Sequence, residues 1–217
     1  IDKQRRAYID LSHIILRRIF NNGVFDQGGR FYGGWWQNIP KVFRHRIRIN
    51  GHEVVEYDYS EIHARLLYKD IPDMMPSNIY QPIEAIDRKV GKFTFNAMLN
   101  AKEDRGISLP KKLQPFKEKF AMEWKDFRQV MMTYHAHIAD HFYSGVGLEL
   151  QYKDSCIAEA VLMHFTNKNI SCLPIHDSFI IAKEHKEELQ FVMTQKALEI
   201  AGIDIPIENA WNKVELL

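Results

Sequence analysis

The spacing of apolar residues changes several times along the chain, which predicts a mixed α/β protein. Residues 5–20 repeat apolar side chains at the spacing of an amphipathic helix. Residues 44–58 instead alternate on both sides of Asn50-Gly51, a dipeptide that favours a two-residue hairpin turn. In that register Arg48 faces Glu53, so opposite charges would pair across the two strands.

Asp58 lies where this strand pattern gives way to a helical one. The strand side carries β-forming residues, and the side beyond Asp58 repeats apolar residues at helix spacing after a plausible N-cap. These residues are Val54, Val55 and Tyr57, followed by Ser60, Ile62, Leu66 and Leu67. A lone aspartate at such a junction is more often a turn or cap residue than a catalytic one. Its interpretation therefore depends on a second acidic position.

A second hairpin is predicted at residues 170–183. Two short β runs flank His176-Asp177-Ser178, which places an acidic residue at the hairpin tip. If the strands of the two hairpins are neighbours, the carboxylates of Asp58 and Asp177 point to one place.

The remaining periodic segments predict helices and one final strand. Prolines make residues 69–82 a loop, and residues 203–217 fit a short strand or an extended edge. Helices are expected at 84–101, 116–143, 154–167 with Asp154 as its cap, and 185–201. Arg88, Lys92, Asn96 and Asn100 recur every fourth residue and so form one polar stripe. Such charges on a helix are usually a solvated face.

Composition sets wide bounds on function. The 217 residues suggest one or two domains, and 46% of them are hydrophobic. The net charge of +1 gives no overall positive potential that would attract nucleic acid. Two cysteines without metal-ligand spacing fit a reducing intracellular protein, either cytoplasmic or encoded by a phage or plasmid. No apolar run reaches the roughly 18 residues of a membrane span. An opening Ile1 is consistent with a processed or excised piece of a longer chain.

Residues 27–52 contain basic and aromatic residues and no acidic ones. They include Arg30, Lys41, Arg44, Arg46 and Arg48, interleaved with Phe31, Tyr32, Trp35, Trp36 and Phe43. This combination suits a nucleic-acid backbone and its bases. A solvated basic strand beside a buried aromatic cluster explains the composition equally well.

Two aspartates on neighbouring strands could together hold two Mg²⁺ ions. Mg²⁺ prefers hard oxygen ligands and shares them with substrate phosphates. Arg88 and Lys92, one helical turn apart, suit a triphosphate. With a basic, aromatic segment for a nucleic-acid strand, these features together describe a templated nucleotidyltransferase.

Four motifs in this order resemble family A DNA polymerases and the related phage-type single-subunit RNA polymerases. Residues 58–67 resemble the first catalytic motif, D-Y-S-Q-I-E-L-R, and Arg88-x-x-x-Lys92 resembles the R-x-x-x-K of the nucleotide-binding helix. Residues 175–179 resemble the second catalytic motif, and Asp26-Gln27-Gly28-Gly29-Arg30 matches an upstream D-x-x-G-R element. The motifs extend over residues 26–183, and the ordered set is more specific than any one of them.

The resemblance implies a role for each matched residue. Asp58 and Asp177 would be the metal ligands, helped by the backbone carbonyl of Tyr59. Arg88 and Lys92 would hold phosphates, and Lys92 would also be a candidate proton donor to the leaving pyrophosphate. The remaining implied roles are a contact with the nucleic acid for Arg30, on the primer, and for His176, which would also brace the catalytic hairpin. His63 and Asn96 would contact the nucleotide.

Three departures from the family pattern affect these expectations. His63 stands where the DNA polymerases carry a Glu that excludes the ribose 2′-hydroxyl, so sugar selection is open. Asn96 and Asn100-Ala101 stand where an aromatic or Met and then Tyr-Gly are usual, which alters the base-stacking platform. Ser178 replaces the Glu of the DNA enzymes and matches the phage RNA polymerase form.

The sequence therefore predicts an α/β (α+β) palm with a small antiparallel sheet backed by helices. The palm is expected at residues 1–69 and 144–217, with a helical fingers-like subdomain at 70–143. The expected function is a DNA polymerase that extends a primer 3′-hydroxyl with two Mg²⁺ ions, for which Mn²⁺ could substitute. Expected partners are a primer–template and nucleoside triphosphates, with no membrane, and a missing thumb or accessory region is possible.

Three alternatives stay open at this stage. An RNA polymerase or primase-like enzyme is suggested by His63 and Ser178. A non-catalytic nucleic-acid-binding remnant of a polymerase is suggested by Asn96, Asn100 and the lack of a recognisable thumb. A metal-dependent nuclease could use the same two aspartates.

Overall fold

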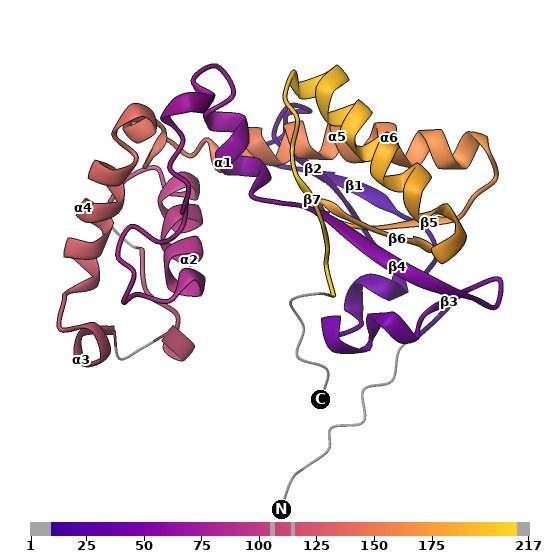
Figure 1. Cartoon of the computed structure of the whole chain (residues 1–217), viewed down its shortest axis with the longest axis horizontal. Helices are drawn as coiled ribbons and strands as arrows, with labels where there is room; N and C mark the ends of the chain where they lie inside the picture. The colour runs from indigo at the N-terminus through magenta and orange to yellow at the C-terminus, as the bar shows by residue number, and fades with distance from the viewer. Residues whose placement is uncertain (1–9, 105–106, 114–115, 212–217) are drawn as a thin grey trace, which may run out of the picture. The chain divides into compact units, whose positions relative to one another are not determined.

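The computed structural model describes residues 10–104, 107–113 and 116–211. The chain divides into two compact units, one formed by residues 1–62 with 151–217 and the other by residues 63–150. The first unit is a mixed α/β structure and the second is helical (Figure 1). Their identification as palm and fingers remains a prediction.

An antiparallel sheet forms the centre of the first unit. Its strands run in the order β3-β4-β6-β5, and β7 pairs with β4 beyond the end of β3. The bounds are β3 Arg48–Ile49, β4 His52–Tyr59, β5 Cys172–Ile175, β6 Ser178–Ala182 and β7 Ile207–Asn209. Both predicted hairpins are present, β3–β4 and β5–β6, and β7 falls within the predicted final strand segment.

The predicted register of the first hairpin is confirmed, but its first strand is shorter than expected. Arg48 pairs with Glu53, and their side chains form an exposed ion pair of 3.9 Å. Residues 41–46 form a 3₁₀ helix, η2 (Lys41–Arg46), rather than a strand. The reason is that Arg44 turns inward to bond the Ile39 carbonyl and the Glu56 carboxylate, which draws this segment over the sheet.

The two faces of the sheet have different covers. Figure 1 shows α5 (Gly147–Asn167) and α6 (Lys186–Ala201) on one side of the sheet, where the Tyr59 hydroxyl donates to the Met193 carbonyl of α6. The opposite face carries an apolar cluster that is covered by η1 (Trp35–Asn38) and η2. This cluster contains Trp36, Ile47, Val54, Ile175 and Ile180. Because side chains alternate along a strand, Glu56 and Asp58 share the face of Val54.

One predicted helix of the first unit is absent, and another begins earlier than predicted. Residues 17–20, predicted as helix, form strand β1 (Arg17–Phe20), which pairs with β2 (Gly28–Tyr32), and residues 10–16 are not helical. Residues 5–9 of that predicted helix lie outside the described part of the chain. Asp154 is not a cap, because α5 begins at Gly147 and places Asp154 two turns inside the helix. Its carboxylate pairs instead with Arg30.

The second unit is built from short helices. They are α1 (Ile62–Leu67), η3 (Pro72–Met74), α2 (Arg88–Asn100), η4 (Lys111–Leu113), α3 (Phe116–Phe120), α4 (Trp124–Tyr134) and η5 (Ala136–His141). The single helix predicted at 116–143 is therefore wrong, since Ala121 adopts a positive φ between α3 and α4 and Ile138 is non-helical within η5. The predicted helix 84–101 begins later, at Arg88. The reason is that the Gln81 side-chain amide donates hydrogen bonds to the backbone carbonyls of Glu84 and Ile86, which in a helix would accept from backbone amides.

Gly91 allows α2 to approach the segment before it. A Cβ at this position would lie 1.6 Å from the Tyr80 carbonyl oxygen, a backbone atom that cannot move aside. We expect Gly91→Ala to lower the free energy of unfolding of the second unit by about 1–3 kcal/mol, the usual cost of overpacking. In an open helix the same change would stabilise by about 1 kcal/mol. Chemical denaturation measures the effect, with the exposed Lys89→Ala as a control on the same helix; an unchanged Gly91→Ala midpoint would contradict the close approach.

His135 is a buried hydrogen-bonding link in the second unit. Its Nε2 lies 2.8 Å from the Ile79 carbonyl and donates to it, so the neutral ring accepts from the Tyr68 hydroxyl through Nδ1 at 2.9 Å. Burial lowers the pKa of His135 below 6.5, although the bond to Ile79 opposes this shift.

Acid should therefore weaken the second unit through His135. The unfolded chain binds the proton more readily, so stability falls as the pH drops from about 6.5 through the folded-state pKa. Hydrogen exchange of α2 amides at several pH values measures this loss. His135→Gln can keep both hydrogen bonds without titrating and should flatten the profile; an unchanged profile would assign the pH dependence to other groups.

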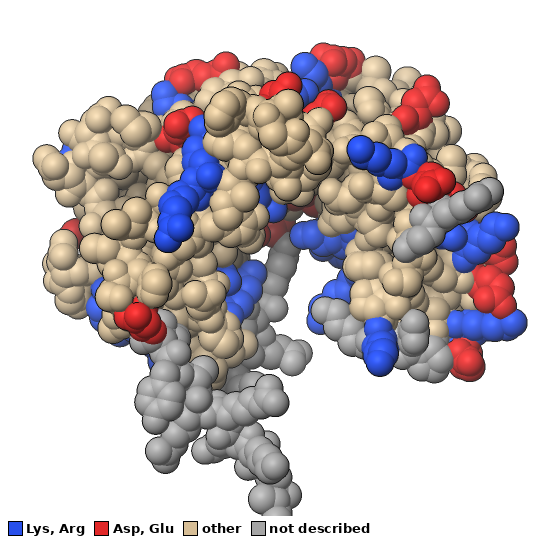
Figure 2. All heavy atoms as spheres, turned by 180° about the vertical axis from the view of Figure 1, so that it is seen from behind, with Lys and Arg blue, Asp and Glu red and all other residues tan. Residues whose placement is uncertain are grey.

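Charged residues do not form a field of one sign on the face shown in Figure 2, where acidic and basic side chains are interspersed. This agrees with the net charge of +1. Among the described residues, no helix is both long and apolar enough to cross a membrane.

Candidate active site

The two predicted catalytic aspartates lie at the same end of neighbouring strands. Asp58 of β4 is paired with Ser178, the first residue of β6, and Asp177 directly precedes Ser178. The Tyr59 amide also lies 3.4 Å from the Asp177 carbonyl oxygen, to which it donates. Both aspartates are half-buried. The sheet therefore brings together two acidic residues that are more than 100 positions apart in the sequence.

The turn that carries Asp177 contains only His176 and Asp177. Ile175 pairs with Ser178 across it, and His176 adopts a φ of 59°, which is uncommon for a residue with a side chain. The His176 ring packs edge-to-face on Tyr32, with 5.4 Å between centroids. Its Nδ1 is buried and has no hydrogen-bond partner among the described residues. Burial is the main cause that lowers the pKa of His176, so the neutral ring is favoured.

Arg30 lies beside this turn but is held by another residue. Its guanidinium pairs with the Asp154 carboxylate of α5 at 2.5 Å, and the Asp154 side chain is fully buried. Burial alone would lower the pKa of Arg30, yet the hydrogen bonds and charge of Asp154, followed by the charge of Asp177, raise it. The positive charge of Arg30 is therefore fixed within the influence of Asp177, and a primer contact by Arg30 stays a prediction.

The predicted phosphate-binding residues lie together in the second unit. Arg88 and Lys92 are exposed on α2, and their cationic groups lie 5.0 Å and 5.8 Å from the centre of the Tyr80 ring. Such contacts with an aromatic face orient cations without neutralising them. Asn96 lies one turn farther along α2, where its backbone carbonyl accepts from the Asn100 side chain. His63 is in α1. Their roles toward a nucleotide stay predictions.

The basic, aromatic segment has a buried side and an exposed side, and its contact with a nucleic acid stays a prediction. Trp36 is buried and donates its Nε1 hydrogen to the Pro174 carbonyl of β5, and Arg44 pairs with Glu56. Lys41, Phe43 and Arg46 of η2 are exposed, and the Arg46 guanidinium lies 5.3 Å from the Phe43 ring centre. One side of the segment is thus core, while the other presents cations around an exposed aromatic ring.

Several residues near the aspartates were not predicted from the sequence to belong to the site. Glu208 of β7 is paired with Asp58 across the sheet and accepts from the Ser60 hydroxyl at 3.0 Å. Glu56 lies two residues before Asp58, and Asp154 holds Arg30. Alternation along β4 could have indicated Glu56, whereas β7 and α5 meet the site only through tertiary pairing.

The site offers hard oxygen donors, which is the chemistry that Mg²⁺ requires. Asp58 and Asp177 supply two carboxylates, and the hydrogen bond from the Tyr59 amide to the Asp177 carbonyl oxygen keeps the Tyr59 backbone next to Asp177. In the described part of the chain, no three His, Cys, Asp or Glu side chains form a ready-made metal cage. Mg²⁺ sites that share substrate phosphates need only one or two carboxylates, so this donor set fits.

The chain matches no protein-family model and no curated protein. Among solved structures it is similar to the POL domain of Pol1 from M. smegmatis, in complex with DNA primer-template and dNTP. The TM-score is 0.51 and the identity 12%, over 85% of this chain and 45% of that one. The chain thus spans less than half of that polymerase structure. At this identity the similarity shows the fold, and it confirms the predicted mixed α/β class.

Proposed function

We propose that the chain catalyses template-directed nucleotidyl transfer, with extension of a DNA primer as the first candidate reaction. The observation that carries this proposal is the pairing of the Asp58 strand end with the Asp177 turn. The polymerase-like fold supports it, because the similar POL domain is described with a primer-template and dNTP.

The proposed mechanism assigns the aspartates to metal binding. Asp58, Asp177 and the Tyr59 carbonyl would hold two Mg²⁺ ions, which supply Lewis-acid activation of the attacking 3′-hydroxyl and charge neutralisation on the triphosphate. Support comes from the position of the two half-buried carboxylates, one near the end of β4 and the other in the turn directly before β6, because groups held in place by the fold need little reorganisation to bind a cation. Arg30, held by Asp154, adds a fixed positive charge close to Asp177.

The second unit would supply the contacts to the nucleotide. Arg88 and Lys92 would bind the phosphates, and Lys92 would donate a proton to the departing pyrophosphate. Their placement supports this role, because both cations lie against the same Tyr80 ring and therefore close to each other. Asn96 would contact the base and His63 the sugar.

Ribonucleotide transfer, as in an RNA polymerase or primase-like enzyme, is the second candidate. It is favoured by His63 and Ser178, which depart from the DNA-polymerase pattern. His63 replaces the Glu to which the resemblance assigns exclusion of the ribose 2′-hydroxyl.

Primer extension tests the proposal. A labelled primer–template is incubated with Mg²⁺ and either deoxy- or ribonucleoside triphosphates, with Asp177→Ala as the matched inactive variant. We expect extension by the natural sequence only, and the preferred sugar decides between the two candidates.

Two other outcomes would contradict nucleotidyl transfer by this chain. Primer–template binding that survives in Asp177→Ala, without any extension, would indicate a non-catalytic binding module. Metal-dependent shortening of the labelled strand without added nucleotides would indicate a nuclease.

A further inference from the structure

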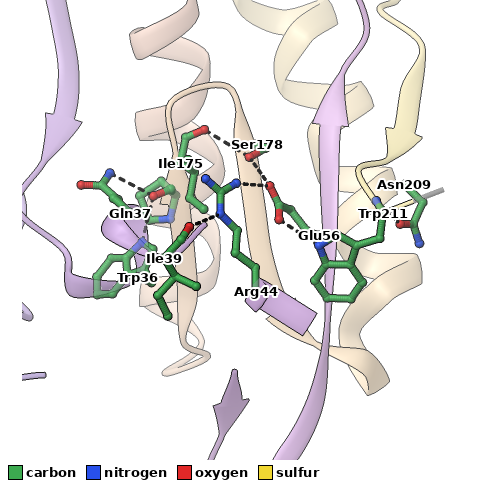
Figure 3. A network of polar contacts seen from close by, with 10 residues as sticks. Trp36, Gln37, Ile39, Arg44, Glu56, Ile175, Ser178, Asn209 and Trp211 are labelled. Carbon is green, nitrogen blue, oxygen red and sulfur yellow. Dashed lines mark hydrogen bonds and ion pairs between the residues drawn. The ribbon is translucent and has the colours of Figure 1, made fainter. Parts of the chain in front are cut away.

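Glu56 is a buried carboxylate in the strand that carries Asp58. It is 1% exposed, lies in the middle of β4, and shares the sheet face of Asp58 because it is two residues away. A buried carboxylate requires compensating hydrogen bonds, and Glu56 accepts them from three separate segments. Figure 3 shows these contacts converging on its two oxygens.

The three donors divide between the two oxygens of Glu56. Arg44 of η2 donates through Nη1 at 2.9 Å and Ser178 of β6 through its hydroxyl at 3.0 Å, both to Oε1. Trp211 donates through Nε1 to Oε2 at 3.0 Å. The carboxylate therefore connects η2, β6 and the segment after β7.

The contact with Ser178 connects Glu56 to the predicted catalytic turn. Ser178 follows Asp177 directly and is the cross-strand partner of Asp58. Its hydroxyl lies within hydrogen-bond distance of both Glu56 and the Ile175 carbonyl, at 3.0 and 3.1 Å. A hydroxyl has one hydrogen, and a carboxylate is the stronger acceptor, so the bond to Glu56 dominates.

The other side of the same turn is held by a neighbouring element. The Pro174 carbonyl of β5 accepts hydrogen bonds from Trp36 Nε1 at 2.9 Å and from Gln37 Nε2 at 3.1 Å (Figure 3). Both strands that lead into the His176-Asp177 turn are thereby fixed by side chains from residues 36–56. A turn held at both bases has little freedom to shift its aspartate.

We propose that Glu56 is a positioning residue that fixes Asp177 relative to Asp58 through Ser178. This inference rests on the proposed function, in which both aspartates bind metal. Positioning groups behind metal ligands typically change metal affinity or activity by about 10- to 100-fold when removed. Glu56 would act through Ser178 and not as a ligand, because its oxygens accept hydrogen bonds from Arg44, Ser178 and Trp211.

The test must separate positioning from the cost of an unpaired buried charge. Glu56→Gln alone would leave Arg44, whose side chain is 14% exposed, without its counter-ion. The informative variant is therefore Arg44→Met combined with Glu56→Leu, which removes both charges and also the acceptor for the Ser178 hydroxyl. Ser178→Ala removes only the connection to the turn. Glu53→Gln is the matched control, because Glu53 lies on the same strand, is exposed, and pairs with Arg48 and Lys183.

Three measurements follow for each variant. In primer extension we expect kcat to fall about 10- to 100-fold and the Mg²⁺ concentration for half-maximal rate to rise by a similar factor. The KM for nucleotide should stay unchanged, because Arg88 and Lys92 are untouched. Mn²⁺ binding followed by electron paramagnetic resonance should weaken about 10-fold or more in the absence of substrate. Hydrogen exchange at the Tyr59 amide, which donates to the backbone carbonyl of Asp177, should accelerate about 10-fold.

Ser178→Ala and the charge-neutral double variant should show the same pattern, and their combination should add little. Unchanged Mn²⁺ affinity and Tyr59 exchange in folded variants would overturn the positioning role, as would equal effects of Glu53→Gln. Natural chain that binds Mn²⁺ without extending primers would contradict the proposed function alone. Natural chain that neither binds Mn²⁺ nor extends would contradict both.

Discussion

Asp177→Asn is expected to lower the rate of primer extension by at least about 10³-fold while leaving thermal unfolding nearly unchanged. The proposed two-metal chemistry requires several kcal/mol of charge stabilisation, and about 1.4 kcal/mol corresponds to a factor of ten. Asp177 is half-buried in a two-residue turn, and Asn is similar in shape, so the fold should tolerate the change. Single-turnover extension and calorimetry measure the two quantities.

The matched control for this prediction is Asp204→Asn. Asp204 is exposed in the same unit, shortly before β7. The Asp204→Asn variant should extend primers at the same rate as the natural sequence. A loss below tenfold in Asp177→Asn would show that Asp177 does not hold a catalytic metal, and an equal loss in both variants would point to an effect of net charge.

Asp154→Leu is expected to lower the free energy of unfolding of the first unit by about 3–5 kcal/mol. The Asp154 side chain is fully buried and the Arg30 side chain is 17% exposed. The variant therefore leaves the guanidinium of Arg30 largely buried without its counter-ion. Breaking a buried pair by removing one partner has this cost, whereas replacing both partners with apolar residues is often neutral. Arg30→Met combined with Asp154→Leu should therefore recover most of the lost stability.

A matched comparison exists on the same helix. Glu159 pairs with Arg18 at 2.7 Å but is 49% exposed, so Glu159→Gln should cost less than about 1 kcal/mol. Urea unfolding of the variants measures these differences. Equal losses for Asp154→Leu and Glu159→Gln would contradict the importance of burial. A double variant as unstable as Asp154→Leu would show that the loss comes from packing instead of charge.

Local signals predicted the two hairpins, whereas they failed where tertiary packing decides. Asn50-Gly51 favours a turn within a few residues, and the β3–β4 pairing followed from it. The helical spacing of Leu11, Ile14 and Ile15 was misleading, because these side chains are exposed and the chain continues into strand β1. Apolar spacing alone cannot distinguish such a segment from an amphipathic helix.

The candidate site was predictable to the extent that its residues occur in motifs. Asp58 and Asp177 could be identified in advance, and the structure places their strands side by side. The partners that fix them could not be identified, because Glu56 is bonded by Arg44, Ser178 and Trp211 from three distant segments. Asp154 looked like a helix cap until α5 proved to begin at Gly147.

The pairing of β4 with strands from distant parts of the chain has a consequence for the order of folding. One edge of this strand pairs with β6, and the other is divided between β3 and β7. During synthesis β4 emerges well before its partners at residues 178–182 and 207–209, so contacts at Tyr57–Tyr59 are among the most non-local in the chain. Until β7 arrives, this end of β4 presents unpaired backbone groups that other chains could use. The strand that carries Asp58 is therefore completed by nearly the last described residues.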